Sequence, residues 1–203
     1  MTSRFLNLVF TPSVKAAQVA NGSRDAYARR DSASEADRLT ENEIAFIAGR
    51  DSFYMATVGA GGWPYMQHRG GPPGFVKILN ERTLGLADFR GNRQYVTVGN
   101  LVDDDRASLF FMDYVRRARL KLLGRVRAID LAEAPELSAA LVDQDYGAKI
   151  ERGLIIDVEA IDWNCPQHIT PRFTTAELTP TIEALKARIA ELEAEIGNNL
   201  SAI

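Results

Sequence analysis

The chain has 203 residues, of which 46% are hydrophobic and 25% are charged, with a formal net charge of −3 at pH 7. This composition is ordinary for a globular domain and excludes disordered, collagen-like and disulfide-scaffold classes, while the slight negative charge gives no general attraction to nucleic acid. Cys165 is the only cysteine, which excludes an internal disulfide and the usual thiolate zinc site.

Residues 1–38 are predicted to form an N-terminal arm. Their hydrophobic run, 5–10, includes an asparagine and is too short for a signal core or a membrane span, so we expect a soluble, cytoplasmic protein. The polar, Ala-rich stretch 11–38 has weak helical spacing with a break at Asn21-Gly22. Because it has too few large apolar residues for a core of its own, it should pack on the main domain or on a partner subunit.

A helix is predicted to begin after Thr40, since Thr40 and Glu43 form a capping-box pattern, and to stop at Gly49. Short runs rich in aromatic and β-branched residues follow at 53–59 and 63–70, joined by a Gly-rich turn. This pattern indicates a β-hairpin.

A second hairpin is predicted from the runs 75–79 and 83–87, with Asn80-Glu81-Arg82 between them. Four strands in such quick succession favour a mostly antiparallel sheet or barrel over alternating βαβ units. Further strands are expected at 107–114, 118–130, with a bulge at Gly124, and 153–162, and a helix is expected over 132–150.

The end of the second hairpin predicts a phosphate site. Gly91 and Asn92 tolerate positive φ, which lets backbone N–H groups converge on an anion. Arg90 and Arg93 flank this turn, and with Lys77 on the neighbouring strand they would form a phosphate clamp. The alternative is a solvated hairpin end with surface arginines.

A short helix is expected between Asn92 and Asp103, with its N-terminal amides directed at the same place as Arg93. A spacing of three or four residues places four side chains on one face of this helix, namely Tyr95, Val98, Leu101 and Val102. In the tail, residues 177–196 show apolar side chains at alternating steps of four and three, which is a coiled-coil seam. This helix should pack on the body or on its twin in a dimer.

Catalytic motifs are sparse. The two histidines, His68 and His168, lie a hundred residues apart and do not by themselves make a metal site. The Pro-bounded loop 163–173 is more informative, because it collects an aromatic plane, amides and a cation that would suit a flat, anionic ligand such as a flavin nucleotide. The alternative for this loop is a buried Trp163 with hydrogen-bonded neighbours.

These residues resemble the pyridoxamine 5′-phosphate oxidase-like family of FMN-binding split barrels. In that family a strand lysine is followed at fixed intervals by two residues at the end of the next strand and by a Ser-Arg-Lys turn that opens a helix. Here Lys77, Ala87-Asp88 and Asn92-Arg93-Gln94 have the same intervals. Residues 103–111 and 119–129 resemble the following strands, and the loop 163–172 resembles the family's closing Trp and Arg.

The resemblance implies a mainly β (α+β) fold, a split antiparallel β-barrel over residues 39–175 with flanking helices, and the spacing in the tail adds a C-terminal amphipathic helix over 176–203. It also implies a homodimer with FMN between the subunits and an oxidoreductase activity on an unknown small-molecule substrate. The implied cofactor-binding residues are Arg69, Lys77, Ala87, Asp88, Asn92, Arg93, Gln94, Arg119, Trp163, Gln167, His168 and Arg172.

The sequence departs from the family at positions that bear on activity. Pro72 stands where the family has an arginine, with Arg69 three residues before it, and the family's substrate-phosphate residues have no counterparts that we can place. The catalytic residues and the substrate therefore stay open. Two alternatives remain: a non-catalytic flavin or heme-type carrier or sensor, and an interaction module whose C-terminal helix pairs subunits.

Overall fold

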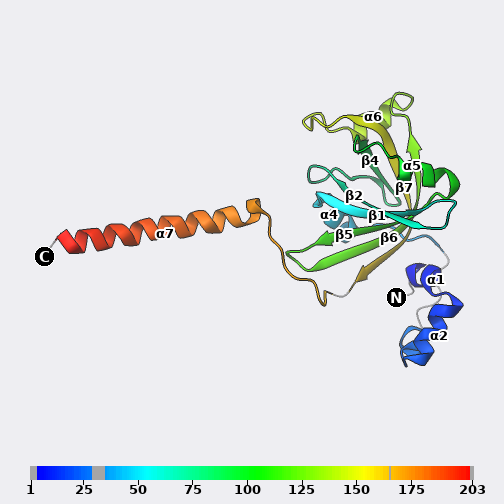
Figure 1. Cartoon of the computed structure of the whole chain (residues 1–203), viewed down its shortest axis with the longest axis horizontal. Coiled ribbons are helices and arrows are strands. Elements are labelled where there is room, and N and C mark those ends of the chain that lie inside the picture. The colour runs from blue at the N-terminus through cyan, green and yellow to red at the C-terminus, as the bar shows by residue number, and fades with distance from the viewer. Residues whose placement is uncertain (1–3, 29–34, 165, 202–203) are drawn as a thin grey trace. The chain divides into compact units, whose positions relative to one another are not determined.

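The computed structural model describes residues 4–28, 35–164 and 166–201, and they form two compact units that are treated separately. Residues up to 113 and from 118 to 166 make up the first unit, which holds the sheet (Figure 1). Residues 114–117 and those from 167 onward make up the second. Cys165, the lone cysteine, lies outside the described residues.

The first unit is a seven-stranded antiparallel sheet with helices around it. The strands are, in chain order, β1 Ser52–Val58, β2 Pro64–Gly70, β3 Lys77–Asn80, β4 Thr83–Phe89, β5 Arg106–Asp113, β6 Ala118–Ile129 and β7 Ile150–Asn164. The helices are α1 Arg4–Val9, α2 Pro12–Ala20, α3 Arg24–Ala28, α4 Glu41–Ala48, α5 Val96–Asp103 and α6 Pro135–Leu141. Both predicted hairpins are confirmed, as β1 with β2 and β3 with β4.

The strand order, β2-β1-β5-β6-β7-β4-β3, explains why the sheet curls. Its two edges, β2 and β3, are consecutive in the chain and are joined only by residues 71–76. A flat sheet of this order would separate its edge strands by about 29 Å, whereas this connection reaches at most about 25 Å. The sheet therefore bends into an incompletely closed barrel, the split barrel predicted from the sequence.

A continuous apolar core fills the inside of the barrel. Alternate residues of β1, β5 and β6 point inward and are buried, as period-two strands require. The largest of these side chains are Phe53, Met55, Leu109, Phe111, Leu120 and Leu122. The long β6 changes register with β7 between Leu123 and Gly124, which confirms the predicted bulge.

Helix α4 begins as the sequence predicted. The Glu43 carboxylate accepts a hydrogen bond from the Thr40 backbone N–H at 2.9 Å and another from the Thr40 hydroxyl, and the helix ends at Gly49. The arm breaks at the predicted place, with Gly22 at φ 70° between α2 and α3. Its first helix packs on β7, where Arg4 pairs with Glu159 at 3.5 Å.

Two helix predictions need correction. The helix expected over 132–150 is only seven residues long, because Leu141 is its last fully buried residue, and the chain is irregular from there to β7. In α5 the buried face is formed by Thr97 and Leu101, whereas Val102 is 84% exposed. A polar threonine faces inward because its hydroxyl bonds to the Gln67 side chain at 2.9 Å, which spacing alone does not reveal.

The second unit contains helix α7, Thr175–Ser201, and the turn between β5 and β6. Thr174 and Glu177 form a capping box at the helix start, with the Glu177 carboxylate accepting from the Thr174 N–H at 2.8 Å. Within this unit the Arg172 guanidinium lies 4.8 Å from the centroid of the Tyr114 ring. None of the described helices in either unit is both long and apolar enough to cross a membrane.

Candidate functional site

A polar cleft lies where β2, the end of β4 and the start of α5 meet at the split of the barrel. It encloses about 410 Å³ of space, part of it open to solvent. The cleft is lined by Tyr65, Gln67, Arg69, Asp88, Phe89, Gly91, Asn92, Arg93, Tyr95, Val96, Thr97, Val98 and Glu151. Four of the predicted site residues, Arg69, Asp88, Asn92 and Arg93, are thus brought together in it.

A buried charge cluster forms the floor of this cleft. Arg69 on β2 pairs with Asp88 on β4, and both side chains are about nine-tenths buried, with 11% and 9% exposed. Arg152 on β7, opposite Asp88 in the sheet, reaches the same carboxylate at 3.4 Å. Since β3 pairs with β4 only up to Gly85, Asp88 lies beyond the end of β3, and the Arg69–Asp88 pair bridges the open side of the barrel.

Two nitrogens of this cluster lack a hydrogen-bond partner among the described residues, Nε of Arg69 and Nε of Arg152. The Nε atom of Arg69 is inaccessible to solvent and has no hydrogen-bond acceptor in the described part of the chain. Buried polar atoms are nearly always satisfied, so Arg69 carries a donor that neither the described residues nor open solvent satisfies.

The loop from Gly91 to Tyr95 forms one wall and leads into α5. The Asn92 side chain accepts the Gln94 backbone N–H at 3.1 Å, which makes an Asx-type turn. The left-handed residues are Arg93 at φ 61° and Tyr95 at φ 55°, not Gly91 and Asn92 as the sequence predicted. Because the asparagine side chain shapes the turn itself, the strained positions fall one and three residues later.

The start of α5 brings its first turn to the lining of the cleft. Its first intrahelical acceptor, the Tyr95 carbonyl, takes the N–H of Gly99 at 2.9 Å. The preceding amides belong to the first turn, where N–H groups have no partner within a helix. Val96, Thr97 and Val98 carry these amides and all three line the cleft.

Arg93 and Tyr95 connect the loop to β7. Arg93 donates from Nε to the Tyr95 hydroxyl at 3.3 Å, and that hydroxyl donates to Glu151 at 3.1 Å. Arg90 pairs with Glu151 at 3.2 Å. Desolvation raises the pKa of Glu151, but the bonds from Tyr95 and Arg152 and the charge of Arg90 outweigh it, so the net pKa is lowered and the carboxylate is ionised at neutral pH.

The charge balance of this region is positive. Arg69, Arg90, Arg93 and Arg152 stand against only two carboxylates, Asp88 and Glu151. Arg93 is exposed, and its side chain donates to the Tyr95 hydroxyl, which is a neutral group. The guanidinium of Arg93 therefore keeps donors available to a ligand. Together with the first-turn amides, the arrangement is suited to a phosphate group.

Other predicted site residues lie around the cleft or away from it. Ala87 precedes Asp88 on β4 and is buried. The backbone N–H of Gln94 donates a hydrogen bond to the Asn92 side chain. Lys77 is on β3 opposite Gly85 and is not among the residues that line the cleft. Arg119 lies on β6 opposite Asn164, and its Nε is buried with no acceptor among the described residues.

Trp163 is held within its own chain at the end of β7. Its indole N–H donates to Glu43 on α4, and its ring packs edge-on against Phe46 with 4.8 Å between centroids. Burial raises the pKa of Glu43, but hydrogen bonds from Thr40 and Trp163 outweigh it, and the net pKa is lowered. Gln167, His168 and Arg172 belong to the second unit, so their role at the cleft stays a prediction.

Sequence reasoning found Arg69 on β2 but missed two other residues of this strand, Tyr65 and Gln67. Tyr65, Gln67 and Arg69 occupy alternate positions on this strand, so they share one face of it and all line the cleft. This period-two polar pattern was readable from the sequence, whereas Glu151, a residue at the start of β7, had no local signal.

A second hollow adjoins the first. It encloses about 570 Å³ of largely open space between the β1–β2 turn and α5, and it shares Tyr65 and Val96 with the cleft. Trp63 lines it and is 85% exposed. The two hollows together offer a polar end and an end with an exposed aromatic ring.

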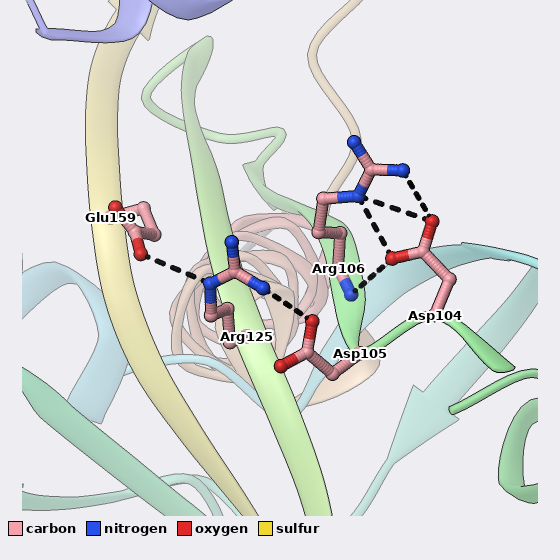
Figure 2. Close-up of polar contacts among 5 residues, drawn as sticks. All are labelled: Asp104, Asp105, Arg106, Arg125 and Glu159. Carbon is pink, nitrogen blue, oxygen red and sulfur yellow. Dashed lines mark hydrogen bonds and ion pairs between the residues drawn. The ribbon is translucent and has the colours of Figure 1, made fainter. Parts of the chain in front are cut away.

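A third hollow, of about 1110 Å³, lies over β1, β5 and β6. Figure 2 shows the ion pairs among five residues that lie at or beside it. Arg106 pairs with Asp104 at 2.5 Å, and Arg125 lies between Asp105 at 2.6 Å and Glu159 at 3.3 Å. Hydrogen bonds from Arg106 lower the pKa of Asp104 to about 2. Each of these carboxylates has a guanidinium partner, so the charges around this hollow are paired within the chain.

Comparison with known proteins gives a family and several structures of low similarity. The family model described as pyridoxamine 5′-phosphate oxidase matches residues 39–172. HupZ from Group A Streptococcus is 18% identical, with 66% of this chain and 100% of that chain covered and a TM-score of 0.46. An FMN-binding protein from Syntrophomonas wolfei is 13% identical, with 74% and 97% covered and a TM-score of 0.47. No curated protein matches the sequence significantly.

Proposed function

This chain belongs to the pyridoxamine 5′-phosphate oxidase family, and we propose that it is an FMN-binding oxidoreductase with the cofactor phosphate in the cleft at the barrel split. One observation carries the proposal: Arg93, Arg69 and the first turn of α5 line a single cleft. A phosphate dianion needs several converging donors and a positive field, and this cleft has both.

The residues present fit the phosphate end of a flavin nucleotide. Arg93 would hold phosphate oxygens through its planar fork, and the amides of Val96 and Thr97 would bind the remaining oxygens. Asp88 would keep Arg69 oriented rather than repel the phosphate, because it is already paired with two guanidiniums. Lys77, Asn92 and Gln94, which the family resemblance also implied, remain part of the proposed ribitol and phosphate environment.

The adjoining hollow is the proposed place of the ring. Trp63 has its ring exposed there, next to the shared Tyr65, and an aromatic plane stacks well on a flat heterocycle. When bound, FMN would supply the hydride or electron transfer. The chain's own residues would bind and orient it, and Arg119 would place a cation near the pyrimidine edge, where it favours an anionic reduced ring.

A second copy of the chain completes the proposed site. Trp63 and Met66 are 85% and 68% exposed beside the split, which is unusual for large apolar side chains on a surface that stays in water. A homodimer would cover them and bring the loop with Gln167, His168 and Arg172 of the other subunit to the ring.

Replacing Trp63 by leucine is expected to weaken the binding of FMN and of riboflavin to the same degree, about 2- to 10-fold, because Trp63 would contact only the flavin ring, which both ligands have. Flavin fluorescence titrations measure both constants. Trp163→Phe is the matched variant, since it keeps an aromatic ring beside Phe46 but removes the indole N–H and the second ring. If Trp163→Phe weakens riboflavin binding and Trp63→Leu does not, the ring lies against Trp163 instead.

Oxidoreductase activity is tested on protein loaded with FMN. Under anaerobic conditions NADH or NADPH should bleach the flavin absorbance, and air should restore it. An Arg106→Ala variant, changed at the third hollow, should behave identically. Tight retention of FMN without reduction by either nucleotide would identify a flavin carrier and contradict the enzymatic half of the proposal.

A further inference from the structure

Helix α7 carries an apolar stripe that is left exposed. Its members are Leu178, Ile182, Leu185, Ile189, Leu192 and Ile196, each between 40% and 59% exposed. Their steps of four and three residues make a heptad seam in which every a position is isoleucine and every d position is leucine. A stripe of this length on a 27-residue helix needs a partner to be covered.

The choice of core residues identifies the partner. Isoleucine at a with leucine at d favours two strands in parallel, because the β-branched side chains pack well in the a layers of that geometry only. A second copy of the same helix supplies the same layers in the same order. Pro180 lies inside the helix at an outer f position, so its ring does not enter the seam, and the N–H that it lacks costs the helix one bond, to the Ala176 carbonyl.

Charges beside the seam fix the orientation. In a parallel, in-register pair, a g residue faces the e residue five positions later in the twin, which sets Arg188 against Glu193 in two symmetric pairs. An antiparallel pair that keeps all six layers would instead bring Arg188 next to its own copy, and Lys186 next to its own copy. Like charges at these positions oppose that arrangement.

Ion pairs of Arg188 within one helix compete only weakly with the pair between the two helices. Arg188 pairs with Glu191 at 2.8 Å and approaches Glu195 at 4.0 Å, and all three side chains are more than half exposed. Exposed pairs of this kind contribute little, so the guanidinium is free to exchange Glu191 for the twin's glutamate.

We propose that α7 pairs with α7 of a second copy as a parallel, in-register, two-stranded coiled coil, held in register by Arg188 and Glu193. This assembly is independent of the flavin site. It would tether two chains even where the barrels separate, and it would raise the effective concentration of one barrel for the other.

Disulfide trapping in the full chain tests the pairing directly. On a Cys165→Ser background, Leu178→Cys and Ile196→Cys are expected each to give a covalent dimer under mild oxidation, because a parallel pair places identical core residues side by side. Ala187→Cys, at an outer f position, is the control and should stay monomeric on a non-reducing gel. An antiparallel pair would hold the two Leu178→Cys sites about 27 Å apart. Absence of cross-linking at 178 and 196, or equal cross-linking at 187, overturns the proposal.

A charge exchange provides a second measurement that does not disturb the core. On the Ile196→Cys background, Arg188→Glu or Glu193→Arg alone should lower the yield of cross-linked product, and the double exchange should restore it. Mixing the two single variants should restore it as well, since both interchain pairs then have opposite charges. Cross-linking that ignores these charges would contradict the proposed register.

Discussion

The Arg93→Ala variant is expected to bind FMN about 10- to 150-fold more weakly than the unchanged protein, the effect of losing one charge-assisted hydrogen-bonding partner of a phosphate. The side-chain partner of Arg93 is a neutral phenol, so its charge is available to a ligand. Alanine keeps a Cβ at the left-handed φ of 61°, so the backbone strain of the loop should not change. Isothermal titration calorimetry with FMN measures the loss.

Two variants sharpen this prediction. Arg93→Lys keeps the charge and loses the planar fork, so its affinity for FMN should lie between those of the unchanged protein and Arg93→Ala. Arg106→Ala removes an arginine that is 74% exposed at the third hollow and should leave FMN affinity unchanged. Equal effects of Arg93→Ala and Arg106→Ala would mean that general charge, rather than this cleft, attracts the nucleotide.

The second large effect concerns stability. Asp88→Ala is expected to lower the free energy of unfolding by about 3–5 kcal/mol, because it leaves buried guanidiniums without their counter-charge. Arg69 is 11% exposed and Arg152 is 23% exposed, so water cannot replace the lost carboxylate fully. The pair also bridges β2 and β4 across the split, and these two strands are not neighbours in the described sheet. Urea denaturation followed by circular dichroism measures the change.

Asp157→Ala is the matched control for this stability effect. Asp157 pairs with Arg127 on neighbouring strands of the same sheet, but the two side chains are 52% and 56% exposed. Removing an exposed pair should cost less than about 1 kcal/mol. If Asp88→Ala and Asp157→Ala shift the urea midpoint equally, the bridge across the split does not stabilise the barrel.

Local sequence patterns correctly predicted the elements that depend on residues close together in the chain. The capping box of Thr40 and Glu43 and the turns of the two hairpins depend on residues a few positions apart, and the structure has them as expected. The split barrel followed from four closely spaced strands together with the family resemblance. The helix expected over 132–150 was overestimated because helical composition continues past Leu141 while burial does not.

The site was predictable only in part, because half of it comes from distant segments. Arg93 and Asn92 were visible as a turn with cations, but the pairing of Arg69 with Asp88 requires the sheet to curl and bring β2 to β4. Glu151 reaches the cleft only through the register of β7, 56 residues after the tyrosine that it contacts. Contacts of this kind depend on the closed topology and have no signature within a window of sequence.

The most direct test of the phosphate cleft is the ratio of the dissociation constants of riboflavin and FMN, measured in the same buffer for the unchanged protein and for Arg93→Ala. We predict that the unchanged protein binds FMN far more tightly than riboflavin, and that Arg93→Ala loses most of this difference while its riboflavin affinity stays the same. Equal affinity of the unchanged protein for the two flavins, or a ratio that the substitution leaves intact, would contradict a phosphate site at the start of α5.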